Sequence, residues 1–153
     1  MSFDGSLVTL LYFVYGAAAV TGGGLAGVSS DRFGPRRTLL TAIVLVCACL
    51  LIIPHTTGVP PLFWLVLVLW GALSWSITPP IQSHLVQLSP ATADIQQSLN
   101  TAVLHFGIAF GASVGSVVVD HASVQRNPIV GAFLIVIAFA TARVTLKSGR
   151  KAP

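Results

Sequence analysis

The stretch GVSSDRFGPRR, Gly27 to Arg37, carries four of the twelve charged residues of the chain, which has only eight Lys and Arg and four Asp and Glu in total. The next charged residue after Arg37 is Asp94. One Arg or Asp at the middle of a membrane helix costs about 2.5–3.5 kcal/mol, so a long interval without charge indicates surroundings of lipid. We therefore interpret the stretch as a polar turn between two membrane-spanning segments.

The composition of the whole chain favours the same interpretation. The 153 residues are 54% hydrophobic and 8% charged, with a mean hydropathy of +0.87. An ordinary soluble domain is about 25% charged, and this chain could not cover a soluble surface with so few charges. The net charge of +4 does not indicate a nucleic-acid partner, because the basic residues are divided between the turn and the C-terminal tail and form no continuous stripe.

A helix needs roughly 20 apolar residues to cross about 30 Å of hydrocarbon, and the sequence contains five apolar segments of about this length. We expect spans at residues 6–28, 38–53, 59–78, 95–119 and 129–146. The second is short and is predicted to end at Pro54, and a separate amphipathic helix on the cytoplasmic surface is predicted after Pro80. The sequence thus predicts an all-α membrane protein with a single transmembrane domain.

The basic residues predict the orientation of these spans. If the turn lies in the cytoplasm, seven Lys and Arg residues are inside and Arg126 alone is outside. This asymmetry follows the positive-inside rule, and a change of one in the number of spans would destroy it. We expect a multi-pass protein of the cell (inner) membrane, with its N-terminus outside and its C-terminus in the cytoplasm. No removable signal peptide is expected.

Two groups of glycines predict close contacts between helices. Residues 22–27 read GGGLAG and match a dinucleotide-binding pattern, but they follow an apolar helix and no acidic residue lies about 20 positions later. Close approach of two helix backbones is the favoured interpretation. Gly107, Gly111 and Gly115 are spaced by four and predict the same packing role for the fourth span.

Several residues within the spans are candidates for a substrate or proton pathway. Trp70 could pack against another helix or line a cavity, and both interpretations stay open. A histidine as deep as His105 is a functional candidate in a membrane protein, although a hydrogen bond to a neighbouring helix would also account for it. The full set of candidates is Tyr12, Tyr15, Trp70, Asn100 and His105. No catalytic arrangement, phosphate-binding loop or metal-ligand spacing is present in the sequence, so no enzyme, cofactor or metal is expected.

The turn, written Gly27-x-x-x-Asp31-Arg32-x-Gly34-x-Arg36-Arg37, resembles a loop signature of the major facilitator superfamily. There it lies between the second and third helices and again between the eighth and ninth. The segment WGALSWSITPPIQSHLVQLSP, followed by SLNTAVLHFGIAFGASVG, resembles the tenth and eleventh helices of the drug-proton and sugar efflux branch. The resemblance implies that the chain corresponds to helices eight to twelve, a partial C-terminal half-bundle. The family pattern has Asn where this chain has His105.

The resemblance further implies a secondary transporter that works by alternating access, energised by a proton gradient rather than by a bound cofactor. The signature residues would form a conformational latch, in which Asp31 faces the N-terminus of a helix in the other half. Substrate sites in this family lie between two halves. The expected partners are therefore the lipid bilayer, a small-molecule substrate, and a missing N-terminal half or a partner membrane protein.

Two other functions stay open on the residues alone. The chain could be a non-transporting membrane scaffold or regulatory protein that packs against a partner through its Gly-rich faces. It could also be a small multidrug-type transporter that assembles from identical copies. The second alternative is disfavoured because none of the five expected spans contains an Asp or Glu to carry protons.

Overall fold

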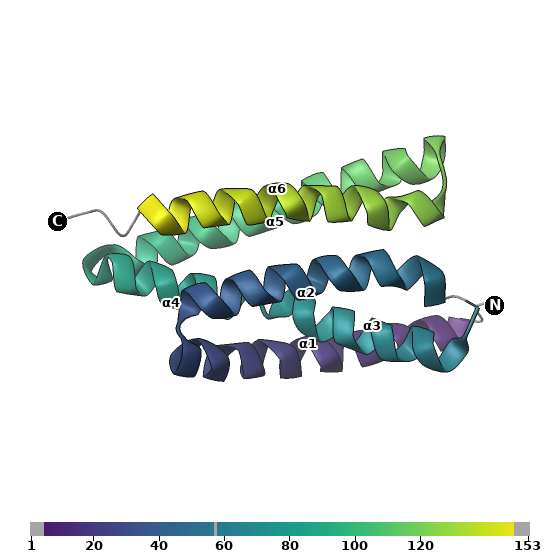
Figure 1. The fold of residues 1–153 in the computed structure, drawn as a ribbon, viewed down its shortest axis with the longest axis horizontal. Helices are drawn as coiled ribbons and strands as arrows, with labels where there is room; N and C mark the ends of the chain where they lie inside the picture. The colour runs from purple at the N-terminus through teal and green to yellow at the C-terminus, as the bar shows by residue number, and fades with distance from the viewer. Residues whose placement is uncertain (1–4, 57, 149–153) are drawn as a thin grey trace.

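The computed structural model describes residues 5–56 and 58–148, and that part of the chain is built of helices without strands (Figure 1). The helices are α1 (Gly5–Phe33), α2 (Pro35–Thr56), α3 (Pro60–Trp75), α4 (Thr78–Leu88), α5 (Ala93–His121) and α6 (Asn127–Ser148). Two short 3-10 helices, η1 (Pro90–Thr92) and η2 (Val124–Arg126), precede α5 and α6. The predicted all-α class is confirmed.

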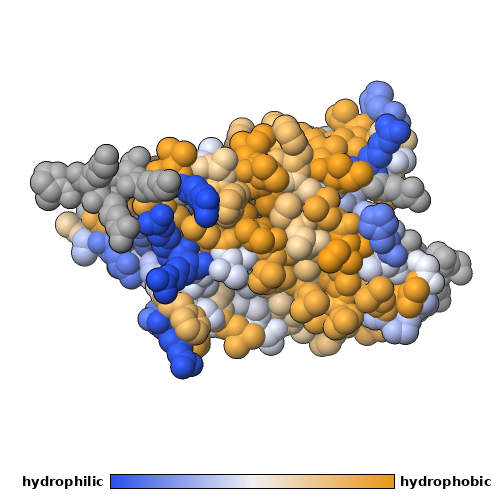
Figure 2. Space-filling view, in the orientation of Figure 1, coloured by the Kyte–Doolittle hydropathy of each residue, from blue (hydrophilic) through white to orange (hydrophobic). Residues whose placement is uncertain are grey.

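Five helical segments are long and apolar enough to cross a membrane, as the sequence predicts. They are Gly5–Phe33, Pro35–Thr56, Pro60–Leu88, Pro90–His121 and Asn127–Leu146. A helix rises about 1.5 Å per residue, so even the shortest of these segments reaches about 30 Å. Figure 2 shows a broad apolar band across the middle of the visible face, with hydrophilic residues gathered at its two ends. This distribution matches that of a protein that spans a bilayer.

The third span differs from its prediction, because it is a broken helix. The predicted span at 59–78 and the separate amphipathic helix after Pro80 are instead α3 and α4, which follow one another across a turn at Ser76. The break comes before Pro79 rather than after Pro80, since a helix tolerates prolines in its first turn, where backbone N–H groups have no intrahelical acceptor. With 16 residues, α3 rises only about 24 Å, so α4 completes the crossing.

The second span is longer than predicted. The expected segment at 38–53 was to end at Pro54, but α2 continues through Pro54 to Thr56. A proline in the last turn removes only one helical N–H donor, and the Thr56 hydroxyl donates a hydrogen bond of 2.8 Å to the Ile53 carbonyl. Thr56 is 1% exposed. The resulting 22-residue helix is long enough to cross the hydrocarbon without thinning the bilayer.

Helices α1 and α3 approach each other closely. A Cβ atom added to Gly22 would collide with the backbone of Ala72, and one added to Gly71 would lie 3.1 Å from the Tyr15 carbonyl oxygen. The Ser76 hydroxyl lies 3.1 Å from the Gly22 carbonyl oxygen across the same interface and 2.7 Å from the Ala72 carbonyl oxygen of its own helix, so these two acceptors share its one hydrogen. The close helix approach predicted for residues 22–27 is therefore confirmed at Gly22.

Helix α2 occupies the middle of the bundle and packs against α3 on one side and α6 on the other (Figure 1). A buried cluster of Leu39, Ile43 and Leu146 holds α2 to α6. Helix α5 contacts α4 and α6 sparingly and contains no buried residue. The α1–α2 turn and the end of α6 lie at one end of the molecule, and the α5–α6 connection lies at the other (Figure 1).

Candidate functional site

The charged turn reduces to one residue between two antiparallel helices. Gly34 alone separates α1 from α2, and its φ of +87° lies in the left-handed region that favours glycine. Its N–H donates a hydrogen bond of 2.9 Å to the Ser30 carbonyl, which closes α1 in the way that a glycine after a helix commonly does. Pro35 begins α2, where its fixed φ suits the first helical position. The sequence prediction of a tight turn at Gly34 is confirmed.

The charged side chains of the turn differ in what they contact. The Arg32 guanidinium lies 5.5 Å from the centroid of the Phe33 ring, a cation–π contact. Arg37 lines a groove between α1, α2 and α3. Asp31 is exposed and forms no ion pair with any residue that the structure describes. Its carboxylate is therefore available to a group outside the described chain.

Three of the five pathway candidates meet in one cavity. Tyr12 and Tyr15 of α1 and Trp70 of α3 line a space of about 500 Å³ together with Val8, Leu11 and Leu67. The Tyr15 and Trp70 rings are 5.2 Å apart between centroids and tilted by 45°, within the range that aromatic pairs prefer. We refer to this space as the aromatic cavity. The sequence nominated its three aromatic residues but did not place them together.

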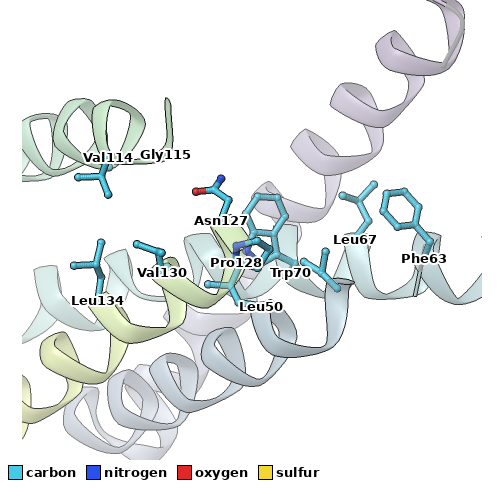
Figure 3. A pocket seen from close by; sticks show the side chains of 13 residues that line it. Leu50, Phe63, Leu67, Trp70, Val114, Gly115, Asn127, Pro128, Val130 and Leu134 are labelled. Carbon is cyan, nitrogen blue, oxygen red and sulfur yellow. The ribbon is translucent and has the colours of Figure 1, made fainter. Parts of the chain in front are cut away.

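Trp70 also lines a second cavity, of about 440 Å³, between α2, α3, α5 and α6 (Figure 3). Its walls are mainly aliphatic, and Asn127 at the start of α6 brings a polar side chain to it. The Asn127 carboxamide oxygen lies where it would be 3.4 Å from a Cβ added to Gly115. Sequence reasoning missed Asn127, because Asn127-Pro128 is an ordinary signal for the start of a helix.

The two remaining candidates are not brought to these cavities. Asn100 is partly buried on α5 and His105 is exposed on the same helix, and neither lines the aromatic cavity or the second cavity. The glycine ladder of α5 is predicted to pack against another helix. A Cβ added to Gly107 or Gly111 would meet no atom of the described chain within 4 Å, whereas one added to Gly115 would meet the Asn127 side chain. Helix packing at Gly107 and Gly111 therefore stays a prediction.

Among the residues described, no group of three His, Cys, Asp or Glu side chains could hold a metal ion. What the structure offers is an aromatic cavity at the α1–α3 contact, a glycine-hinged charged turn, and an uncovered face of α5.

Comparison with known proteins assigns the family. A family model described as Major Facilitator Superfamily matches residues 1–153. The chain belongs to the Major Facilitator Superfamily. As a member, it is a multi-pass membrane protein of a transporter family, in agreement with its five apolar helices.

Curated superfamily members share low identity with the chain over nearly its whole length. It is 28% identical over 148 residues to an uncharacterized MFS-type transporter, YbcL, of Bacillus subtilis (strain 168), covering 97% of this chain and 38% of that protein. It is 29% identical over 150 residues to a probable sugar efflux transporter of Helicobacter acinonychis (strain Sheeba), again covering 97% and 38%. The chain thus spans under two fifths of the length of these relatives. No solved structure matches it significantly.

Proposed function

We propose that this superfamily member supplies the C-terminal five helices of a secondary transporter that exports small molecules by alternating access. The observation that carries the proposal is the combination of a family match over residues 1–153 with coverage of only 38% of the relatives. Substrate sites of such transporters lie at the interface of two repeats. The chain would therefore provide one wall of the path, and an N-terminal half or a partner membrane protein would provide the other.

The aromatic cavity is the proposed substrate-facing part of this wall. Tyr12 is 76% exposed although it lines the cavity, so its ring is available to a ligand or to a partner helix. Aromatic faces bind the apolar faces of sugar rings and of drug-like molecules, and the tyrosine hydroxyl adds a polar contact. Because the Helicobacter acinonychis relative is named a probable sugar efflux transporter, sugars are the first substrate class to test.

The charged turn is the proposed conformational latch. The proposed latch consists of six residues at and around the turn, of which only Gly34 lies outside a helix: Gly27, Asp31, Arg32, Gly34, Arg36 and Arg37. The unpaired carboxylate of Asp31 supports the proposal, because a carboxylate gains about 0.3–1 kcal/mol beside the N-terminus of a helix. Such a contact, made in one conformation and lost in the other, would bias the equilibrium between the two.

Proton coupling is a further part of the proposal. None of the five expected spans contains an Asp or Glu, which leaves His105 as the candidate within this chain for carrying a proton through the hydrocarbon. Any other carrier would lie in the partner half. The proposed location is the cell (inner) membrane, with the Gly34 turn and the C-terminus in the cytoplasm. The distribution of the basic residues supports this orientation.

A chimera tests the proposal. The chain would replace the C-terminal part of the Helicobacter acinonychis relative, and efflux of labelled sugars from cells would be measured with and without a protonophore. We expect protonophore-sensitive efflux from the chimera, loss of efflux in Asp31→Asn, and little change in Arg126→Gln, which removes one charge from the other end of the molecule. Protonophore-sensitive transport by the chain alone in liposomes would refute the need for a second half.

The uncovered glycines of α5 favour a second candidate, a membrane scaffold that binds a partner helix without transport. Gly107 and Gly111 have open space around them, which a small-xxx-small interface would fill. A scaffold predicts that Gly107→Leu abolishes capture of the partner, while Asp31→Asn has no effect in any transport assay. The transporter predicts that both substitutions reduce efflux by the chimera.

A further inference from the structure

A groove of about 580 Å³ lies between α1, α2 and α3, at the end of the bundle that carries the Gly34 turn. It shares no lining residue with the aromatic cavity. Its walls come from Ser29 and Phe33 of α1, Arg37 and Thr41 of α2, and Leu69 and Leu73 of α3, among others. The proposed transport function uses Arg37 only as part of the turn and leaves the groove itself without a role.

The groove changes from polar to apolar along its length. Arg37, Thr41 and Leu45 follow one another at intervals of four residues, so they form one stripe of α2 that extends about 12 Å. The hydroxyls of Ser29 and Thr38 lie towards the Arg37 end, whereas the rest of the lining is mainly apolar and includes leucines of α1 and α3. The Ser76 hydroxyl in that part is already used by backbone carbonyls of α1 and α3. A ligand that fits this gradient has a polar head and an apolar tail.

Arg37 is the charged residue among those that line the groove. None of the residues lining the groove is acidic, and Arg37 is exposed at the mouth. The Phe33 ring also lines the groove, and the guanidinium of Arg32 makes a cation–π contact with this ring. Arginine is well suited to phosphate, because its planar guanidinium donates two parallel hydrogen bonds to phosphate oxygens. The complementary head group is therefore an anion of the phosphate type.

A membrane helix is a poor occupant of this groove. An apolar helix laid over it would take the Arg37 guanidinium out of water without a counter-charge, which costs several kcal/mol. A phosphate brings the counter-charge, and basic pockets between membrane helices commonly hold acidic lipid head groups. We propose that the groove binds one anionic phospholipid, with its phosphate at Arg37, Ser29 and Thr41 and an acyl chain along the leucines. The lipid would come from the leaflet beside the Gly34 turn.

Native mass spectrometry of the full chain, released from detergent, tests this proposal. Phosphatidylglycerol and phosphatidylcholine with the same acyl chains would be titrated against the wild type and against Arg37→Gln. We expect phosphatidylglycerol to bind more tightly than phosphatidylcholine, and Arg37→Gln to weaken phosphatidylglycerol about fivefold (about 1 kcal/mol) with little effect on phosphatidylcholine. Arg126→Gln removes the same charge at the opposite end of the bundle and should leave both affinities unchanged.

A second variant separates the groove from general electrostatic attraction. Thr41→Leu keeps the charge but fills the polar end at an exposed position, and we expect it to weaken phosphatidylglycerol binding as well. Four results would overturn the proposal: equal losses in Arg37→Gln and Arg126→Gln, no preference between the two lipids, unchanged binding in Thr41→Leu, or displacement of the lipid by millimolar inorganic phosphate. A dimer that forms only without lipid would assign the groove to a second copy of the chain and overturn it too.

Discussion

Substitution of Gly22 by alanine tests whether the α1–α3 contact organises the bundle. A methyl group at this position would collide with the carbonyl group and Cα of Ala72. These are backbone atoms, so no flexible side chain can move aside, and the two helices must separate. The hydrogen bond from the Ser76 hydroxyl to the Gly22 carbonyl would lengthen in the same movement.

The size of the effect follows from three terms. Overpacking of a well-packed contact costs about 1–3 kcal/mol, and the loss of an interhelical hydrogen bond in a membrane protein adds about 0.6 kcal/mol. Replacement of glycine by alanine within a helix returns about 0.5–1 kcal/mol. We therefore expect Gly22→Ala to lower the free energy of unfolding by about 1–3 kcal/mol.

Gly24→Ala is the matched control, because a Cβ added to Gly24, two residues further along the same helix, meets nothing within 4 Å. The purified chain in mild detergent would be titrated with sodium dodecyl sulfate. Unfolding would be followed by the fluorescence of the three tryptophans of the chain, Trp64, Trp70 and Trp75, which all lie on α3. We expect Gly24→Ala to match the wild type or exceed it by up to about 1 kcal/mol. If Gly22→Ala unfolds at the same detergent ratio as Gly24→Ala, the contact is not as close as described.

Three further predictions use the same titration. Gly34→Ala should lower the free energy of unfolding by about 1–2 kcal/mol, because the φ of +87° is unfavourable for alanine; Gly27→Ala, where a Cβ meets nothing within 4 Å, should not. Ser76→Ala should lower the free energy of unfolding by about 0.6 kcal/mol, because the variant lacks the hydroxyl that bonds to α1. An unchanged free energy of unfolding would show that this bond does not stabilise the fold. A double-mutant cycle of Tyr15→Leu and Trp70→Leu, followed by the fluorescence of Trp64 and Trp75, which every variant keeps, should give a coupling of about 0.5–1.5 kcal/mol, whereas additive effects would contradict the aromatic pair.

The spans and the turn were predictable because their causes are local. Hydrocarbon rejects charge, so the interval from Arg37 to Asp94 marks helices that cross the membrane whatever they pack against. Gly34 follows from the geometry of two antiparallel helices joined by a single residue, which requires a left-handed conformation. Neither inference depends on a contact with a distant part of the chain.

The features that the sequence did not predict depend on distant contacts or on small energies. Apolar character continues through Ile77, so hydropathy gives no sign that α3 ends at Trp75. The Ser76 hydroxyl beside that break bonds to a carbonyl 54 residues away, which periodicity cannot show. Pro54 is a strong helix-ending signal in sequence, yet in the last turn of α2 it removes only one donor. The outcome is decided by a small difference between competing terms.

The two glycine-rich faces differ in a way that bears on how the molecule could work. Around Gly22, α3 packs against the small residues of α1, so the two helices that form the aromatic cavity are held together by a contact within the chain itself. Around Gly107 the same kind of face is open, and the two pathway candidates of α5 lie apart from that cavity. If the proposed transport is correct, the α1–α3 unit should stay rigid during the cycle. The position of α5 should then be set by whatever covers its glycines, because its few contacts within the chain leave it little to hold it in place.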